Sequence, residues 1–161
     1  GDAELIDELN HYVDHTTADL VGLPVELDQL GEALDQSAGT ESFIDLADAT
    51  VWPAELFDID QEPADFDPES DRWLPVAGLG SQPAYAVMQR FVATIEQPDL
   101  ASGLTDALTG AGAFRRFHTV LSRHEHEFTR WHRFRDDARL GRARSWLADH
   151  GYQPQPQPPP T

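Results

Sequence analysis

Residues 110–152 read GAGAFRRFHTVLSRHEHEFTRWHRFRDDARLGRARSWLADHGY, and the spacing of their apolar side chains predicts two helices. The first helix has a stripe at positions three or four residues apart, made of Phe114, Phe117, Val120 and Leu121. The second is expected over about 126–149, with a stripe of Phe128, Trp131, Phe134, Ala138 and Trp146. Gly151 is placed to end it, because glycine readily adopts the left-handed conformation found after many helices.

Two more helices are expected just before this stretch. Ser81 can cap a helix with Pro83 in its first turn. Its apolar stripe consists of Tyr85, Met88, Phe91, Val92 and Ile95. The next helix opens at Pro98, carries Leu100, Leu104 and Leu108 on one face, and is closed by Gly110 and Gly112. The C-terminal half is therefore predicted to be a compact bundle of about four helices.

A change of hydrophobic period in the first half predicts a small antiparallel sheet. The segment SFIDLADATVW, residues 42–52, indicates a hairpin with strands near 42–46 and 50–53. RWLPV, residues 72–76, is rich in strand formers and is expected at the sheet edge, because Pro75 lacks a backbone N–H. About three strands together with the helices give an α+β fold.

Short helices are expected before the sheet. Leu5, Ile6, Leu9 and Val13 predict one over about 3–14, and Leu27, Leu30 and Leu34 predict another that ends after Ser37. Residues 1–22 are therefore read as an N-terminal helical arm and 23–152 as a single α+β domain with one core. An acidic loop at 58–71 and a disordered Pro/Gln-rich tail at 153–161 complete the predicted organisation.

Charge is strongly segregated along the chain. Residues 1–71 hold 21 Asp and Glu with no Arg or Lys, and the 11 cations, all Arg, lie from Arg72 onward; the net charge is −18. Cys and Lys are absent, which excludes thiolate nucleophiles and Schiff-base chemistry. The lack of Lys fits either a GC-rich genome or a salt-adapted acidic protein. We expect a cytoplasmic protein without membrane contact, and no sequence motif points to a cofactor.

The arginines of the predicted bundle are the main candidates for binding. At 100° per residue, Arg116 and Arg123 point away from the Phe117 stripe, and Arg130 and Arg133 share a face opposite Trp131. The candidate binding residues are Arg115, Arg116, Arg123, Arg130 and Arg133. Guanidinium groups grip carboxylate or phosphate through paired hydrogen bonds, so this face could dock an acidic partner.

An intramolecular role for the same arginines is the competing interpretation. Asp137 lies four residues after Arg133, and Asp136 lies three residues before Arg139, so helical ion pairs are possible. The 58–71 loop could neutralise the remaining arginines within one molecule. A nucleic-acid partner is disfavoured by the net charge.

Two other functions remain open. His124 and His126 in the HEHE run could assist a metal-dependent hydrolase, although no two histidines here share the spacing of the HExxH motif. The acidic half could instead mimic a nucleic acid on a basic protein. No catalytic motif, such as a Gly-x-Ser-x-Gly elbow or a phosphate loop, is present, so we assign no catalytic residue and no metal ligand and expect a non-catalytic binding or regulatory protein.

The motif Gly112-Ala113-Phe114-Arg115-Arg116-Phe117, followed by Arg130-Trp131 and Trp146-Leu147, resembles the uncharacterised bacterial protein family UPF0158. FIDLADATVWPAE, DRWLPV and YAVMQRFVATI extend the resemblance to roughly 24–152. Ala47-Asp48-Ala49 departs from the Thr-Gly-Glu type of turn expected in the family, and 122–128 departs from an aromatic-Pro-acid stretch. The resemblance implies an α+β layout and supplies no reaction and no partner.

Overall fold

The computed structural model describes residues 19–159, so the helix expected over 3–14 lies outside the described part of the chain. The elements of the first half are β1 (Val21–Leu23), α2 (Leu27–Leu34), β2 (Glu41–Asp45), β3 (Thr50–Trp52), α3 (Ala54–Asp58) and β4 (Trp73–Ala77). Those of the second half are α4 (Gln82–Val92), α5 (Pro98–Ala107), α6 (Ala113–Leu121), α7 (Glu125–Asp149) and β5 (Tyr152–Pro154). The α+β fold and the C-terminal helical region are confirmed.

The predicted three-stranded sheet is present with strand order β3-β2-β4, all antiparallel. Phe43 of β2 pairs with Trp52 on one side and with Pro75 on the other. Pro75 lies on an edge strand, as its missing N–H predicts. The short helix α3 was not expected, because five residues after Pro53 are too few to show a helical period.

Two apolar clusters take the place of the single expected core. The first lies between α2, the sheet and the C-terminal part of α7, and it includes Leu30, Ile44, Val76 and Leu147. The second lies among α4, α5, α6 and the N-terminal part of α7. Its buried residues include Met88, Phe91, Leu104, Phe117 and Trp131.

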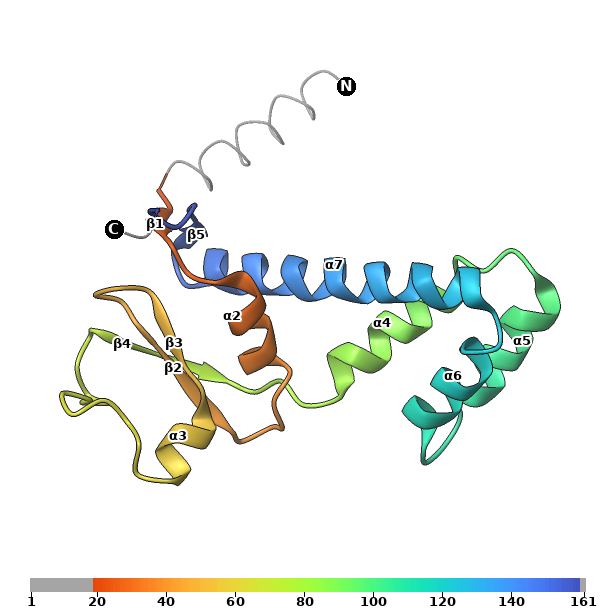
Figure 1. Ribbon diagram of the computed structural model, residues 1–161, viewed down its shortest axis with the longest axis horizontal. Helices are drawn as coiled ribbons and strands as arrows, with labels where there is room; N and C mark the ends of the chain where they lie inside the picture. The colour runs from red at the N-terminus through yellow and green to blue at the C-terminus, as the bar shows by residue number, and fades with distance from the viewer. Residues whose placement is uncertain (1–18, 160–161) are drawn as a thin grey trace, which may run out of the picture.

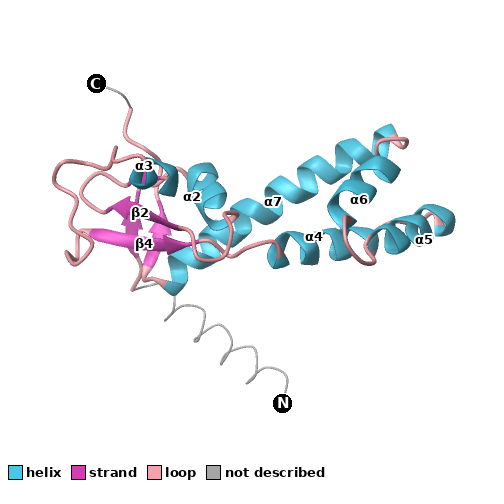
Figure 2. Cartoon of the chain, turned by 90° about the horizontal axis from the view of Figure 1, so that it is seen from below, coloured by secondary structure: helices cyan, strands magenta, loops and turns pink. Residues whose placement is uncertain are grey.

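Helix α7 joins the two clusters. It has 25 residues, which gives it a length of roughly 37 Å at 1.5 Å per residue. It runs along one side of the molecule, with the sheet and α2 near one end and α5 and α6 near the other (Figure 1). Seen from below, the sheet and the helices α4 to α6 are separate groups, and α7 reaches both (Figure 2).

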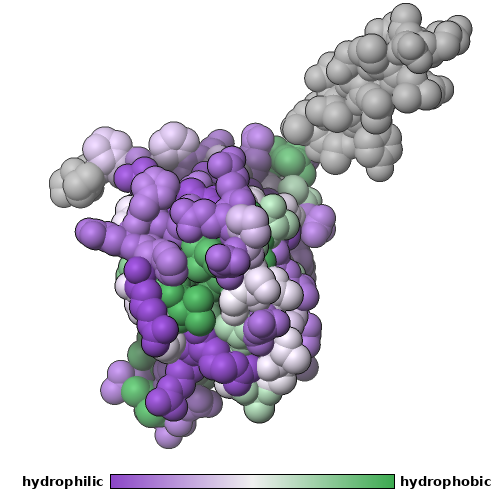
Figure 3. Space-filling model, turned by 90° about the vertical axis from the view of Figure 1, so that its right-hand side faces the viewer, coloured by the Kyte–Doolittle hydropathy of each residue, from purple (hydrophilic) through white to green (hydrophobic). Residues whose placement is uncertain are grey.

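The helical end of the molecule has a mostly hydrophilic surface. Figure 3, which faces this end, shows an apolar area near the middle bordered by hydrophilic side chains. Despite its length, α7 is too polar to cross a membrane, and no other helix within 19–159 has the necessary length and apolar character.

The start of the predicted disordered tail has a regular structure. β5 pairs in parallel with β1, with Val21 opposite Tyr152 and Leu23 opposite Pro154. Pro154 has no N–H, but the ladder does not require one at this position. The hydrogen bond to the Leu23 carbonyl comes from the next residue, Gln155, whose N–H donates at 3.1 Å. The strand β1 also crosses the boundary expected at residue 22 between the arm and the domain.

The acidic loop 58–71 is attached to the sheet by an aromatic side chain and an ion pair. The Phe66 ring lies 4.8 Å from the rings of both Phe43 and Phe57 and 5.1 Å from Trp73, measured between ring centroids. Asp65 in the same loop pairs with Arg72 at 2.6 Å. The acids of this loop are therefore not the partners of the helical arginines, contrary to the sequence interpretation.

An ion pair with a buried carboxylate lies at the turn end of the β2–β3 hairpin. Asp45 is only 4% exposed and accepts hydrogen bonds from Arg72 Nε at 2.8 Å and Nη2 at 2.6 Å. It also accepts the backbone N–H of Ala47 at 3.0 Å. The hydrogen bond from Arg72 is the main reason that the pKa of Asp45 lies below its ordinary value.

We expect Asp45→Asn to lower the free energy of unfolding by about 1–3 kcal/mol, because Arg72 loses the charge of its buried partner. Asp65→Asn is the matched control, since it removes the exposed partner of the same arginine and should cost about 0–1 kcal/mol. Urea denaturation measures both, and equal losses would contradict a special role for the buried pair.

The same pair makes a pH-dependent contribution to stability. Because the pKa of Asp45 is lower in the folded state, its contribution is complete above about pH 4 and is lost as the pH falls through the folded-state pKa. The difference in stability between the wild type and Asp45→Asn should therefore shrink over that acidic range.

Two glycines give a second test of how α7 is built. Gly141 lies inside α7, and an added Cβ there would meet nothing within 4 Å, so Gly141→Ala should raise the free energy of unfolding by about 0.5–1 kcal/mol. Gly31 in α2 is the contrasting position, because a Cβ there would lie 2.5 Å from Arg139 Cγ. Gly31→Ala should destabilise, and thermal or urea denaturation of both variants checks the difference in sign.

Candidate anion-binding groove

Arg116 is exposed, but its guanidinium group makes hydrogen bonds within the protein. Its guanidinium group donates hydrogen bonds to the carbonyls of Thr109 and Ala111, and its Nε donates to Ala107 at 3.2 Å. These acceptors lie at the C-terminal end of α5 and in the turn that follows, where helical carbonyls lack partners. Arg116 therefore closes the α5–α6 connection.

Arg130 is also engaged within the molecule. Its Nε lies 2.7 Å from Glu127 Oε2, and its Nη1 donates to the Thr94 hydroxyl at 2.7 Å. The guanidinium carbon lies 4.5 Å from the centroid of the Phe91 ring, which is a cation–π contact. Arg130 thus links α7 to α4.

The other three predicted binding residues lie on the surface. Arg115, Arg123 and Arg133 are exposed, and they come from α6, from the α6–α7 turn and from α7 respectively. The structure therefore does not bring the five predicted arginines into one site. It separates two that hold helices together from three that face solvent.

The histidine run forms no chelating cluster. His124 is exposed at the N-terminus of α7, and the His126 side chain is 90% exposed with its Nδ1 3.7 Å from Glu127. Over residues 19–159 no group of three or more His, Asp or Glu side chains is placed to hold a metal ion. The hydrolase alternative therefore gains no support from the geometry.

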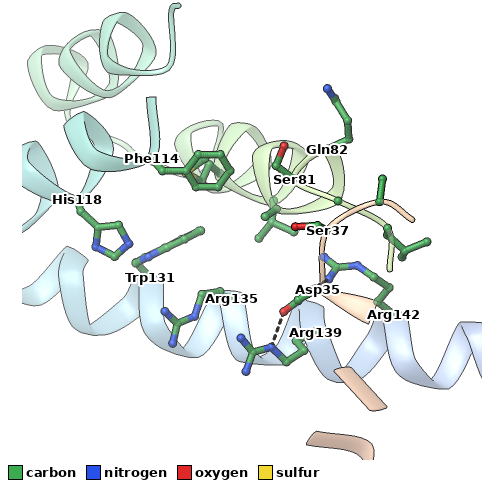
Figure 4. A pocket seen from close by; sticks show the side chains of 16 residues that line it. Asp35, Ser37, Ser81, Gln82, Phe114, His118, Trp131, Arg135, Arg139 and Arg142 are labelled. Atoms are coloured by element: carbon green, nitrogen blue, oxygen red, sulfur yellow. Dashed lines mark hydrogen bonds and ion pairs between the residues drawn. The ribbon is translucent and has the colours of Figure 1, made fainter. Parts of the chain in front are cut away.

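A groove of about 710 Å³ lies between the part of the molecule built around the first apolar cluster and the part built around the second. Its walls come from the α2–β2 connection, the β4–α4 connection, α4, α6 and the middle of α7. The polar residues that line it are Asp35, Ser37, Ser81, Gln82, His118, Arg135, Arg139 and Arg142 (Figure 4). Its volume is in the range of ligand sites in proteins.

One wall of the groove is apolar. Val87 and Met88 of α4 are buried there beside Trp131 of α7. Leu79 and Phe114 stand at the same groove with 40% and 42% of their surfaces exposed. The sequence placed Phe114 in the core stripe of α6; that placement is wrong, because the ring faces the groove instead.

The opposite wall carries three arginines of α7. Arg135, Arg139 and Arg142 are four and three residues apart, so they lie along one face of the helix. Arg139 Nε lies 2.9 Å from Asp35, and Arg142 Nη1 lies 2.6 Å from the other carboxylate oxygen of Asp35 (Figure 4). Asp35 thus ties the end of α2 to α7, and Arg139 does not pair with Asp136 as expected.

Arg135 differs from the other two arginines. Its ion pair is with Asp136, the next residue in the chain, at 3.1 Å, and its side chain remains 38% exposed. Neighbouring residues on a helix do not face each other, and exposed pairs of this kind stabilise little. Arg135 can therefore exchange this contact for an anion in the groove at small cost.

His118 and Trp131 lie beside Arg135 at the α6 end of the groove (Figure 4). The pKa of His118 is lowered, chiefly by burial and then by the positive charges of Arg135 and His132. The indole N–H of Trp131 is buried without a hydrogen-bond acceptor, as are those of Trp52 and Trp73. This end of the groove thus holds Arg135 and His118, and none of the residues that line it there is a carboxylate.

The sequence carries one local signal for this site, the spacing of Arg135, Arg139 and Arg142. Three arginines at helical spacing on α7 could be read from the chain, but Asp35 and His118 come from other elements and have no local relation to them. Chemically, the groove can hold a carboxylate with guanidinium groups and an attached apolar group against the exposed ring of Phe114.

Comparisons with known proteins agree with the resemblance seen in the sequence motifs. A UPF0158 protein of Pseudomonas aeruginosa is 27% identical over 141 residues, which cover 86% of this chain and 91% of that protein. No solved structure matches the chain. The model of the uncharacterised protein family UPF0158 matches residues 22–157, and the chain belongs to this family.

Proposed function

We propose that the protein is a non-catalytic binding module that docks an acidic, partly apolar segment of a partner protein in the groove. The observation that carries this proposal is the arrangement of Arg135, Arg139 and Arg142 opposite an apolar wall that includes the exposed Leu79 and Phe114. A segment with carboxylates and apolar side chains would match both walls at once.

A protein segment suits this groove better than a nucleic acid does. The chain has a net charge of −18, which repels a long polyanion at a distance. Residues 72–161 carry 11 Arg and 8 Asp or Glu, a local excess of three positive charges, so a short acidic segment is attracted to this half. The exposed Arg115, Arg123 and Arg133 add to that attraction without contacting the groove.

Asp35 defines how deep the charged part of the partner can bind. Its carboxylate already occupies Arg139 and Arg142, whose side chains are 28% and 18% exposed. A partner carboxylate would add to this network from the open side or bind at Arg135. The carboxylate of Asp35 thus shows the chemistry that these guanidinium groups accept.

Site-specific photo-crosslinking in native cells tests the docking site. A photoreactive residue at Leu79 should capture partner peptides rich in Asp and Glu, whereas the same residue at Ile59, an exposed apolar position outside the groove, should not. Arg135→Gln should reduce the capture at Leu79 several-fold, because it removes the arginine without an Asp35 contact. Capture that is equal at both positions, insensitive to Arg135→Gln, or free of acidic peptides would contradict the proposal.

Arg116 provides a second test, which separates structural from binding arginines. Arg116→Lys keeps the charge but loses the branched set of donors, so we expect it to lower the free energy of unfolding by about 1–2 kcal/mol. Arg115→Lys, its exposed neighbour, should change stability by less than about 0.5 kcal/mol. Both variants should retain crosslinking at Leu79. If the Arg116→Lys variant folds but no longer captures the partner, Arg116 contributes to binding and the assignment of a purely structural role is wrong.

A further inference from the structure

We propose that His118 and Arg135 form a proton-coupled carboxylate site at the α6 end of the groove. In this site a Glu or Asp side chain of the docked segment would bind Arg135 and the protonated imidazole together. The inference rests on the proposed function, because it concerns the charged group of the same docked segment. It adds a property that the three arginines alone would not have, which is tighter binding at lower pH.

The position of Asp35 leaves room for an anion at this end. Asp35 is the one carboxylate among the described residues that line the groove, and it is held by Arg139 and Arg142. Arg135 lies at least one helical turn away from these residues, toward His118 and Trp131 (Figure 4). At the α6 end Arg135 is the lining cation, and its ion-pair partner, Asp136 at 3.1 Å, does not line the groove.

The surroundings of His118 are positive or apolar. From α7 it faces Arg135 and His132, both of which disfavour its protonation. From α4 the groove receives Val87 and Met88, which do not titrate. The ring of Phe128 lies 6.2 Å from His118 and 4.5 Å from His132, measured between centroids, so an aromatic ring stands beside both histidines.

The charged neighbours of His118 on its own helix are directed elsewhere. Arg116 donates to carbonyls of the α5–α6 turn, and Arg115 lines a separate hollow with Gly103 and Asp106 of α5. Neither arginine lines the groove. The protonation of His118 is therefore governed by what lies in the groove and on α7.

Trp131 forms a buried part of the lining beside His118 and Arg135. The residue is 3% exposed, lines the groove and has an indole N–H without a hydrogen-bond partner. Buried donors in folded proteins are usually satisfied. The indole N–H groups of Trp52 and Trp73, which do not line the groove, are unsatisfied in the same way, so the carboxylate site is assigned to His118 and Arg135 alone.

The coupling between proton and carboxylate has a definite sign. Without a ligand, burial and the neighbouring cations keep the pKa of His118 below its ordinary value. A bound carboxylate favours the charged imidazole, so the pKa rises on binding. By linkage, the segment binds more tightly as the pH falls, by up to about tenfold per pH unit between the two pKa values.

An NMR titration of the whole 161-residue chain tests the site directly. The probe is a synthetic capped peptide that alternates Glu with Leu, and the imidazole signals of His118 are followed with and without it. We expect the pKa of His118 to rise on binding and the peptide Kd to fall by about fivefold to tenfold from about pH 7.5 to about pH 5.5, where Glu remains ionised. Arg135→Gln should weaken binding at both pH values.

Two histidine variants separate this site from a general pH effect. His118→Gln should bind the peptide with nearly the same Kd at both pH values. His126→Gln is the matched control, because His126 is on α7, is 90% exposed in its side chain and lies outside the groove; it should keep the pH dependence. The wild-type titration gives the answer even if His118→Gln does not fold.

The outcomes distinguish the two proposals. Suppose that the peptide binds in an Arg135-dependent way, but the pKa of His118 does not change on binding and the Kd does not change with pH. The proton-coupled site is then wrong, and the proposed docking groove is retained. If the peptide does not bind, or binds equally well to Arg135→Gln, the proposed function itself is wrong. A pH dependence that persists in His118→Gln assigns the proton to another group.

Discussion

The fold depends on one helix that belongs to two apolar clusters at once. Near its start α7 contributes Trp131 to the helical cluster, and near its end it contributes Ala143 and Leu147 to the cluster against α2 and the sheet. Between these two regions, Arg139 and Arg142 of α7 pair with Asp35, the residue that follows α2. Apolar burial therefore sets the two ends of α7, while an ion-pair network sets where the halves meet, and the groove lies at that junction.

The segregation of charge along the chain takes a specific form in three dimensions. Within residues 19–71, Asp45 and Asp65 pair with Arg72 near the sheet, and Asp35 is the acidic residue that pairs with arginines of α7. The arginines divide by task, since Arg116 completes a helix end, Arg130 joins two helices, and Arg135 keeps access to the groove. Counting charges along the sequence cannot make this division, because it depends on which carbonyl or carboxylate the fold brings near each guanidinium group.

Features with a strong local signal could be predicted. The last helix was expected over about 126–149 and is found at Glu125–Asp149, and the hairpin and the edge strand containing Pro75 were also expected. The features that were missed depend on distant partners: β1 pairs with β5, and Asp35 meets Arg139 from 104 residues away. Phe114 has the same helical period as its buried neighbours, and only the placement of α6 over the groove makes it a surface residue.

The location of the groove also bears on how the molecule unfolds. Its lining residues come from the α2–β2 connection, from α4 and α6, and from the stretch of α7 between the two clusters. A ligand bound there needs both halves in place, so its binding free energy adds to the stability of the whole arrangement and to neither half alone. Occupancy of the groove would thus make the unfolding of the two clusters more cooperative.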